Sequence, residues 1–504
     1  MRALIETVAN SPTPEACAAL LQAEPGLVLL RSLLFERAQA RYSILTAKPF
    51  LVFRSRGSRC EINSGGASEV HFGNPWRILD HLIAEYELLD EPDVPFPLGG
   101  CFGFWGYELK NFLEPKLSRR ASPDLELPDC HLGFYSSLVI FDHRIQTTWI
   151  VATGLAPDGS RSQAQARDQI RVWQQRLACA VEPSPLSFRY RESGLTAQLS
   201  APSTAVAPCA SPICSNLTRT EFVERVKRAQ AYIRAGDIYQ VNLSHRLQAP
   251  YERSGWDLFV RLAEVSPAPF SAFLDCGQFE LVSSSPEQFL RLSGGQIQTR
   301  PIKGTRPRAS DPTRDAQLAY ELQTSPKETA ELVMITDLLR NDLGKVCEFG
   351  SVHVSELLRL EQYPQVQHLV STIAGRLRAD QSHFSALAAC FPGGSITGAP
   401  KFRAMQIIDE LEPCARGPYT GALGYLGFNR ESQFSIAIRT AICHRHNVYF
   451  HVGAGIVADS DPQAEYEETL AKGAGFLAAL GQDQASKLGE RVTGRSQGPL
   501  YGDQ

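Results

Sequence analysis

The change from helix to strand is clearest in the stretch Gly236-Asp237-Ile238-Tyr239-Gln240-Val241-Asn242-Leu243-Ser244. Before it, Thr218-Arg219-Thr220-Glu221 fits a helix capping box, and apolar residues then recur at helical spacing over 222–233. Gly236 is a typical residue to follow the end of that helix. From Ile238 onward apolar and polar residues alternate, which predicts a strand. This part of the chain therefore mixes helices and strands.

Four zones of composition are visible along the chain. Residues 1–182 hold short apolar runs, such as Leu138-Val139-Ile140-Phe141, separated by turn residues, which predicts an antiparallel sheet. Residues 183–216 are rich in Ser, Pro and Ala and predict a linker or loop. Residues 217–480 alternate clear helices with clear strands, and residues 481–504 have little apolar content and predict a mobile tail.

The overall composition is that of a globular protein. The chain has 504 residues, 43% hydrophobic and 21% charged, with 50 basic against 54 acidic residues. The net charge of -4 argues against nucleic acid as the main partner, because such proteins usually carry a basic excess. The twelve cysteines form no CxxC pair and are typical of buried thiols in a reducing compartment. With no signal-peptide or membrane-spanning segment, we expect a cytoplasmic protein that does not bind a membrane.

Two pairs of glutamates have the spacing that places both carboxylates on one helix face. Glu328 and Glu331 form the first pair, and Glu465 and Glu468 form the second. Each pair follows a cap residue and a proline, which are strong signals for a helix start. Two such helices could build an oxygen-rich Mg²⁺ site. Two solvated helix faces explain the same spacing, and spacing alone favours that second interpretation.

Two predicted loops and one predicted strand carry residues that could take part in catalysis or binding. Lys303 lies in the basic stretch 301–308, between an apolar residue and a glycine turn. A lysine held in a partly dry pocket can act as a nucleophile, although a surface lysine in a basic loop is the more frequent explanation. The Gly-rich stretch 391–401 precedes a helix, where backbone N–H groups can bind anions. The glycine pair in 452–456 lies in a strand and allows a ligand to approach the backbone closely.

Three further residues are ambiguous when taken alone. His368 lies in an apolar stretch, where a buried structural histidine is the more frequent case. Glu287 follows a predicted strand and has the character of an ordinary turn residue. The stretch 434–439 alternates like a strand, with the isoleucines on one face and Arg439 on the other. Arg439 therefore reaches either a cleft or the solvent.

Taken together, these strings resemble the chorismate-utilising enzyme family, densely over residues 217–480 and more weakly before them. The strings are 236–243, 284–287, the Lys303 loop, 337–342, the Gly-Ala-Pro-Lys loop and 454–460. The resemblance implies one large α+β body. In it two antiparallel sheets pack face to face, helices cover the outside, and the site lies at one edge of the sandwich.

Two positions distinguish the reactions within the family. Isochorismate and salicylate synthases carry a lysine where Gln240 stands, and that lysine activates water for attack at C2. Gln240 cannot act as that base. Anthranilate synthases typically carry alanine where Lys303 stands. The resemblance therefore favours the branch that makes 4-amino-4-deoxychorismate, a precursor of p-aminobenzoate and folate.

The resemblance also implies the site residues. Lys303 would attack C2 of chorismate to form a covalent adduct, and Glu287 would serve as proton donor and acceptor. Glu331 and Glu468 would hold Mg²⁺, with Glu328 and Glu465 beside or behind them. The implied substrate-binding residues are Gln240, His368, Ser395, Tyr419, Arg439, Gly453, Gly455 and Lys472.

Ammonia has to be supplied for such a reaction. The chain has no Gly-rich nucleophile elbow with a cysteine, so the resemblance implies a separate glutamine amidotransferase subunit. Members of the family also bind tryptophan in their N-terminal half. Ser32, in Leu29-Leu30-Arg31-Ser32, matches the serine of that site, while its neighbours depart from the usual pattern.

Three alternatives stay open. The first is an anthranilate synthase component I, against which Lys303 is the main argument. The second is a catalytically silent, ligand-binding paralogue, but such a chain would be expected to have lost a glutamate or the arginine, and none is lost. The third is a flavin or nicotinamide enzyme built on Gly453-Ala454-Gly455, which lacks the third glycine and a βαβ frame.

Overall fold

The helix and strand predicted around Gly236 are both present. The structure, a computed structural model, describes residues 2–9, 11–34, 40–88, 90–180, 213–363 and 366–481. Helix α5 (Arg219–Arg234) begins with the predicted capping box, in which Thr218 and Glu221 bond each other's backbone N–H groups. Gly236 follows the helix with a φ of 80°, a left-handed value that glycine adopts without strain. Strand β12 (Gln240–Pro250) starts two residues later than the alternation predicted.

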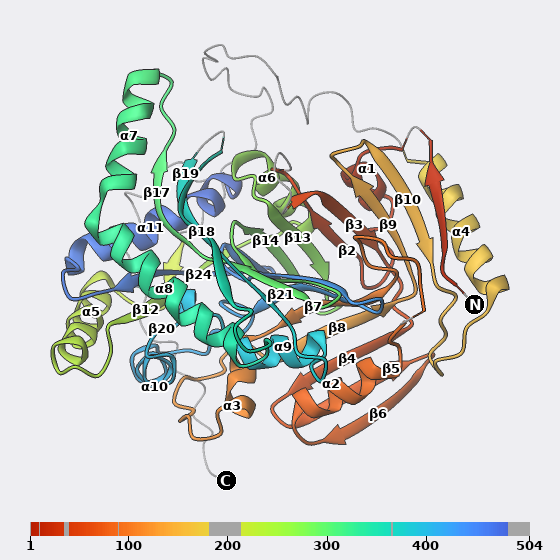
Figure 1. The fold of residues 1–504 in the computed structure, drawn as a ribbon, viewed down its shortest axis with the longest axis horizontal. Helices are drawn as coiled ribbons and strands as arrows, with labels where there is room; N and C mark the ends of the chain where they lie inside the picture. Colours follow the sequence, from red (N-terminus) through yellow and green to blue (C-terminus); the bar gives the residue numbers. More distant parts are fainter. Residues whose placement is uncertain are drawn as a thin grey trace, which may run out of the picture.

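The first sheet has twelve strands and is antiparallel throughout (Figure 1). In spatial order its strands are β1 (Leu4–Val8), β10 (Thr147–Ala152), β9 (Ser137–Asp142), β3 (Tyr42–Thr46), β2 (Val28–Arg31), β13 (Phe270–Asp275), β14 (Glu280–Ser285), β23 (Thr440–His444), β24 (Asn447–Ile456), β12 and β11 (Cys214–Ser215), with β20 (Gly398–Ala399) also paired to β12. Strands from the N-terminal and C-terminal parts of the chain meet where β2 pairs with β13.

The second sheet also has twelve antiparallel strands. Their order is β17 (Ile302–Pro307), β19 (Val366–Arg376), β16 (Gln296–Arg300), β15 (Gln288–Ser293), β22 (Glu431–Ile436), β21 (Ala422–Gly427), β7 (Gly100–Trp105), β8 (Cys130–Tyr135), β4 (Leu51–Arg56), β5 (Arg59–Ser64) and β6 (Ala67–Phe72), with β18 (His353–Gln362) on the side of β19. Here the two parts of the chain meet where β7 pairs with β21.

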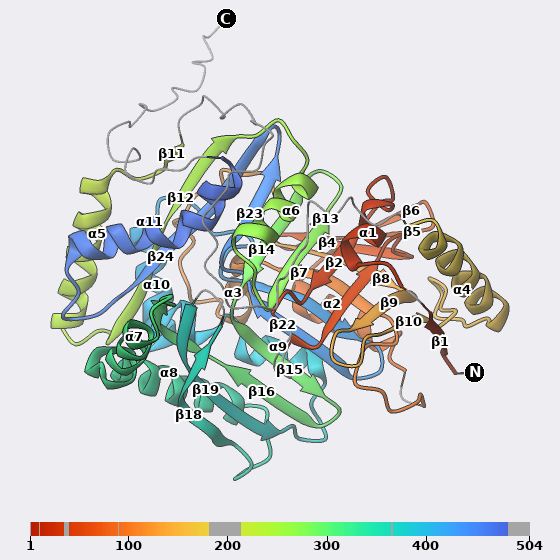
Figure 2. The same ribbon diagram turned by 90° about the horizontal axis from the view of Figure 1, so that it is seen from above.

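Helices cover the outer faces of both sheets. They are α1 (Pro14–Ala19), α2 (Pro75–Ala84), α3 (Lys110–Leu113), α4 (Gln163–Ala178), α5, α6 (Gly255–Val265), α7 (Pro312–Thr324), α8 (Pro326–Gly344), α9 (His383–Cys390), α10 (Lys401–Leu411) and α11 (Pro462–Ala479), with short 3₁₀ turns at Tyr107–Leu109 and Gly394–Ile396. Helix α11 packs on β24 and α8 packs on β19, while α4 packs on β10. Figure 2 shows α4 at one end of the molecule and α5, α7 and α11 at the other.

The apolar core lies between the two sheets and beneath the helices. Ile140, Leu281 and Ile442 from the first sheet meet Phe104 and Leu423 from the second in one buried cluster. Separate clusters fill the space between each sheet and its own helices. The predicted α+β class, with two antiparallel sheets flanked by helices, is therefore confirmed.

Three local predictions need comment. The expected linker at 183–216 lies outside the described residues up to 212, whereas Cys214–Ser215 form β11; the expected tail lies outside them from 482. The predicted strand at 434–439 is too long, because β22 ends at Ile436 and Arg439 has a φ of 47°. The division into regions at 182 and 217 stays a prediction, since both parts contribute strands to both sheets.

The predicted loop around Lys303 is also wrong, because residues 302–307 form the edge strand β17. An edge strand tolerates Pro307, and a bulge between Lys303 and Thr305 accommodates Gly304 at a φ of 67°. Among the residues that the structure describes, no helix is long and apolar enough to cross a membrane.

Candidate active site

The predicted site residues come from the strands and turns near one end of the sandwich. Glu287 follows β14, and Arg439 precedes β23, which pairs with β14. Gln240 begins β12, and both Gly453 and Gly455 lie on the neighbouring strand β24. Lys303 comes from the edge strand of the other sheet. The site is therefore assembled from both sheets.

Glu287 is a buried carboxyl group, with 6% of its surface exposed. Burial raises its pKa from 4.5 to about 7, although a hydrogen bond from Ser395 and the charge of Lys303 act in the opposite direction. A carboxyl with this pKa can both donate and accept a proton near neutral pH. Glu287 therefore has the property that its predicted role requires.

Lys303 faces several carboxylates without pairing closely with any of them. Within the described part of the chain its ammonium forms no ion pair, yet its charge lowers the pKa of Glu287, Glu331 and Glu468. Lys303 therefore lies close enough to Glu287 and to the glutamates of α8 and α11 to influence their protonation. A side chain in this position can reach a ligand that lies between them.

Arg439 has a partly buried guanidinium group. None of its five N–H donors has a partner among the described residues, and burial lowers its pKa. Its neighbour His368 is buried too: burial, followed by the charge of Arg439, lowers the pKa of His368 to about 4, so the imidazole is neutral. His368 Nδ1 lies 2.8 Å from Thr305 Oγ1. An unpaired arginine beside a neutral histidine is suited to bind a carboxylate.

Tyr419 and Gly453 lie against each other. A Cβ atom at Gly453 would lie 2.8 Å from the Tyr419 hydroxyl oxygen, so a larger residue could not be accommodated there. The Tyr419 ring stacks on His451 with 4.9 Å between centroids, and burial raises its pKa to about 12. The hydroxyl is thus a neutral donor, and the described residues provide no acceptor for it. Lys472 donates to the Gly453 carbonyl oxygen at 3.0 Å.

Gln240 is fully buried, and neither end of its amide has a hydrogen-bond partner within the described residues. A Cβ atom at Gly455 would lie 2.5 Å from its Nε2 atom. On the same strand, Asn242 Nδ2 donates to the Ser395 carbonyl oxygen at 3.0 Å. The Gln240 amide therefore joins the Arg439 guanidinium and the Tyr419 hydroxyl as a polar group without a partner among the described residues, although a buried amide normally has partners.

The four predicted metal-binding glutamates lie on α8 and α11. Burial raises the pKa of Glu331 and of Glu465, and nearby glutamates raise both further. Two of these carboxylates form ion pairs with lysines: Lys327 lies 3.7 Å from Glu465, and Lys472 lies 2.8 Å from Glu468. In this arrangement no three acidic, His or Cys side chains of the described chain form a ready metal site. The carboxylate set nevertheless has the chemistry that Mg²⁺ prefers.

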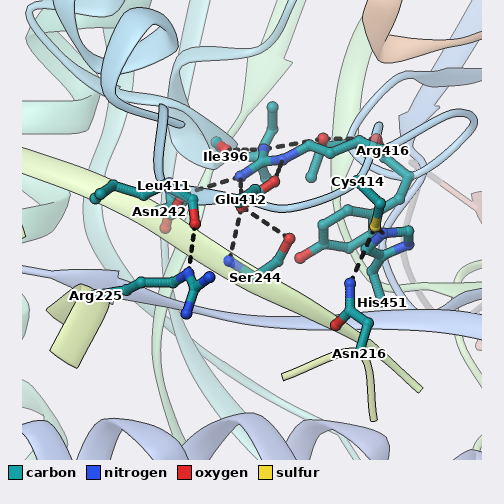
Figure 3. Close-up of polar contacts among 12 residues, drawn as sticks. Asn216, Arg225, Asn242, Ser244, Ile396, Leu411, Glu412, Cys414, Arg416 and His451 are labelled. Carbon is teal, nitrogen blue, oxygen red and sulfur yellow. Dashed lines mark hydrogen bonds and ion pairs between the residues drawn. The ribbon is translucent and has the colours of Figure 1, made fainter. Parts of the chain in front are cut away.

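Behind Tyr419 lies a buried ion pair that the sequence did not reveal. Arg416 donates to both carboxylate oxygens of Glu412, at 2.8 and 2.7 Å, and both side chains are almost fully buried (Figure 3). Ser244 donates its N–H and its hydroxyl to the same carboxylate. The position of Arg416, three residues before Tyr419, was the only signal in the sequence.

Ser32 lies apart from this group. It follows β2, and its hydroxyl donates to the carbonyl oxygens of Ala40 and Pro269. The adjoining cavity has a volume of about 40 Å³ and is lined by none of the predicted chorismate-binding residues. The predicted tryptophan site therefore stays a prediction. The other predicted residues, in contrast, form one connected set around Lys303, Glu287 and Gly453.

Comparisons with known proteins agree on one enzyme family. A sequence model of the chorismate binding enzyme family matches residues 31–478. Aminodeoxychorismate synthase component 1 of Klebsiella aerogenes is 40% identical, over 90% of this chain and 93% of that protein. Anthranilate synthase component 1 of Synechocystis is 38% identical, over 94% and 95% respectively. The crystal structure of anthranilate synthase component I from Streptococcus pneumoniae matches with a TM-score of 0.73 and 30% identity, over 88% of this chain and 93% of that one.

Proposed function

The chain belongs to the chorismate binding enzyme family and is a chorismate-utilising enzyme of its aminodeoxychorismate and anthranilate synthase group, and we propose that it converts chorismate and ammonia to 4-amino-4-deoxychorismate. This is the reaction indicated by the names of its aminodeoxychorismate synthase relatives. The observation that carries the choice is Lys303, an amine that forms no ion pair with any described residue and whose charge acts on the buried Glu287, the proposed proton donor.

The first half of the proposed reaction removes the C4 hydroxyl. The lone pair of Lys303 Nζ forms a bond to C2 of the ring, the two ring double bonds shift, and the C4–O bond breaks. Glu287 gives its proton to the departing oxygen, which leaves as water. The pKa of Glu287, raised to about 7, supports this role because the proton is held near neutral pH.

The second half introduces nitrogen. Ammonia adds to C4, the double bonds return to their first positions, and the C2–N bond to Lys303 breaks. Glu287, now a carboxylate, accepts the proton that ammonia loses. Because Lys303 occupies C2 during the reaction, ammonia is directed to C4 and the anthranilate outcome is avoided.

The unpaired donors of the site hold the substrate in this proposal. The Arg439 guanidinium and the Tyr419 hydroxyl bind one carboxylate beside the Gly453 backbone, where no side chain obstructs it. Gln240 offers an amide where a base would activate water, so water does not replace ammonia as the nucleophile. His368, Ser395, Gly455 and Lys472 complete the wall of the pocket.

We also propose a Mg²⁺ ion at the glutamates of α8 and α11. Glu331 and Glu468 hold it, with Glu328 and Glu465 beside or behind them. Lys327 and Lys472 then release the carboxylates with which they pair. When bound, the ion neutralises a substrate carboxylate that the four glutamates would otherwise repel.

Ammonia is supplied by a glutamine amidotransferase subunit in this proposal. The support is the name of the relatives, each called component 1, which implies a second component. The alternative function is anthranilate synthesis, which is favoured by anthranilate synthases nearly as similar to this chain as the aminodeoxychorismate synthases.

Product identification separates these two functions. The chain is incubated with chorismate, Mg²⁺ and ammonium at alkaline pH, and the products are separated and identified by mass and absorbance. We expect a compound that 4-amino-4-deoxychorismate lyase converts to p-aminobenzoate. Fluorescent anthranilate as the main product would overturn the proposal.

A pair of lysine variants tests the role of Lys303. Lys303→Ala should nearly abolish product formation, whereas Lys227→Ala, on the exposed side of α5, should leave it unchanged. If chorismate is not consumed, the experiment is repeated with the glutamine amidotransferase subunit and glutamine. Continued absence of product would then identify a silent paralogue.

A further inference from the structure

We infer that the buried Arg416–Glu412 pair is a positioning device that holds three separate segments of the chorismate site in register. The inference rests on the site of the proposed function, but it concerns chorismate binding and not the identity of the product. Neither residue belongs to the set expected to touch the substrate. Their role follows from the groups that they join.

Arg416 uses all five of its N–H donors inside the protein. Two go to Glu412, and the remaining three go to the carbonyl oxygen of Asn242 at 2.9 Å, the carbonyl oxygen of Ile396 at 3.3 Å and Thr420 Oγ1 at 3.1 Å. A guanidinium has five donors in a rigid plane, so these partners fix its position fully. Figure 3 shows Arg416 lying across Glu412, between Ile396 and Asn242.

Each of the three remaining acceptors lies one or two residues along the chain from a predicted substrate-binding residue. Asn242 lies two residues after Gln240, and Ile396 follows Ser395, which bonds Glu287. Thr420 follows Tyr419 and donates its own hydroxyl to the Tyr419 carbonyl oxygen at 2.6 Å. Arg416 therefore connects β12, the Gly-rich turn and the segment of Tyr419.

Residues from the N-terminal part of the chain also contact Arg416 and the turn that carries it. The guanidinium lies 4.7 Å from the ring centroid of Tyr107 and 5.6 Å from that of Tyr419. The Glu108 carboxylate accepts the backbone N–H groups of Arg416 and Gly417, both at 2.9 Å. Tyr107 and Glu108 follow β7 after a single residue, so a strand of the second sheet supports the turn that carries Tyr419.

The stability of the fold does not require a buried ion pair at this position. Replacing a buried ion pair with apolar residues of similar volume is often neutral or stabilising, so stability alone does not account for it. Directional bonds to two carbonyl groups and a hydroxyl, in contrast, cannot be reproduced by apolar side chains. The benefit of the pair is therefore expected in the geometry of the site.

The double variant Arg416→Met/Glu412→Leu separates these two roles. We expect its urea unfolding midpoint to lie near that of the wild type, while the dissociation constant for chorismate, measured by calorimetry, rises about tenfold or more because the three segments lose their register. The value of kcat/KM should fall at least as much. Wild-type affinity for chorismate in the folded double variant would overturn the inference.

A milder pair of variants decides the matter if the double variant does not fold. Thr420→Val removes the acceptor nearest to Tyr419 at almost unchanged shape, and Thr420→Ser restores it. We expect Thr420→Val to weaken chorismate binding several-fold and Thr420→Ser to recover it. Equal affinity in both would overturn the inference. Chorismate binding that is intact while the product is anthranilate would contradict only the proposed function.

Discussion

The buried Arg416 and the partly buried Arg439 lie 23 residues apart in the sequence, yet their surroundings are opposite. Arg416 has five acceptors for its five donors and two aromatic rings beside its plane. Burial is the largest single effect on its pKa and lowers it, but the charge and hydrogen bonds of Glu412, together with Tyr107 and Tyr419, outweigh burial and raise the pKa. Arg439 has no protein acceptor within the described residues, and burial alone lowers its pKa. Its backbone also has a φ of 47°, a region that a long side chain rarely adopts.

A structural charge and a functional charge can be told apart by their partners. A buried charge is costly unless it is paired, so a fold retains an unpaired one only where something outside the chain completes it. Arg416 belongs to the scaffold, because the chain itself satisfies it. Arg439 has no partner among the described residues, so we assign it to the proposed binding surface, where a substrate carboxylate would complete it. The comparison predicts that the two arginines respond oppositely to mutation.

The largest effect is expected for Arg439→Gln. Loss of a charged partner to a substrate carboxylate typically costs 2–5 kcal/mol, so kcat/KM for chorismate should fall by about 10³-fold. Thermal stability should be unchanged or higher, because the substitution removes a partly buried charge that has no partner among the described residues. The measurements are steady-state chorismate consumption and thermal unfolding, with Arg445→Gln, an exposed arginine, as the control. If Arg439→Gln lowers stability and retains activity, Arg439 would be part of the scaffold and not of the binding surface.

Arg416→Met should show the opposite pattern. It leaves Glu412 buried without its cation, and breaking a buried pair in this way costs about 3–5 kcal/mol of unfolding free energy. The variant should therefore unfold at a clearly lower urea concentration than both the wild type and Arg439→Gln. A decrease in unfolding free energy below about 1 kcal/mol would mean that the Arg416–Glu412 pair contributes no more to stability than a surface ion pair.

Glu287 extends the comparison to pH. Its pKa is about 7 in the folded chain against 4.5 when unperturbed, so between these values the folded state holds a proton that the unfolded state has released. Stability is therefore lost as pH rises from 4.5 to 7. Glu287→Gln should raise stability above pH 7, by up to about 3 kcal/mol, and have little effect below pH 4.5.

Thermal unfolding of both proteins from pH 4.5 to 8 measures this effect. Glu221→Gln provides a control of opposite sign, because hydrogen bonds from the backbone and side chain of Thr218 lower the pKa of Glu221. That variant should lose stability at neutral pH and approach the wild type in acid. Parallel curves for Glu287→Gln and the wild type would contradict the raised pKa.

Local signals account for what the sequence predicted well. The caps of α5 and α8 are set by residues within one helical turn, and the spacing of Glu328 and Glu331 fixes a common face wherever the helix packs. The pattern of short runs separated by turns gave the antiparallel sheets for the same reason. These features need no knowledge of distant parts of the chain.

Distant contacts account for what the sequence did not show. The stretch around Lys303 has the residues of a loop, but it is a strand because β19, more than 60 residues later, pairs with it. Arg416 lies between prolines and a glycine that are typical of an exposed turn, and it is buried by Tyr107 and Glu108, about 300 residues earlier. Pairing across such separations leaves no periodic signal.

The smallest effect concerns the two tyrosines on either side of Arg416. The Tyr107 hydroxyl is buried without a partner inside the described chain, and the Tyr419 hydroxyl also lacks one there but faces Gly453. Tyr419→Phe should raise the KM for chorismate about three- to tenfold, the value of one hydrogen bond, with little change in kcat or stability. Tyr107→Phe deletes the same atom away from the pocket and should leave KM unchanged while stabilising the fold slightly. Steady-state kinetics of the two variants, side by side, measures the contrast. If both raise KM equally, the hydroxyl of Tyr419 acts through packing around Arg416 and not through the substrate.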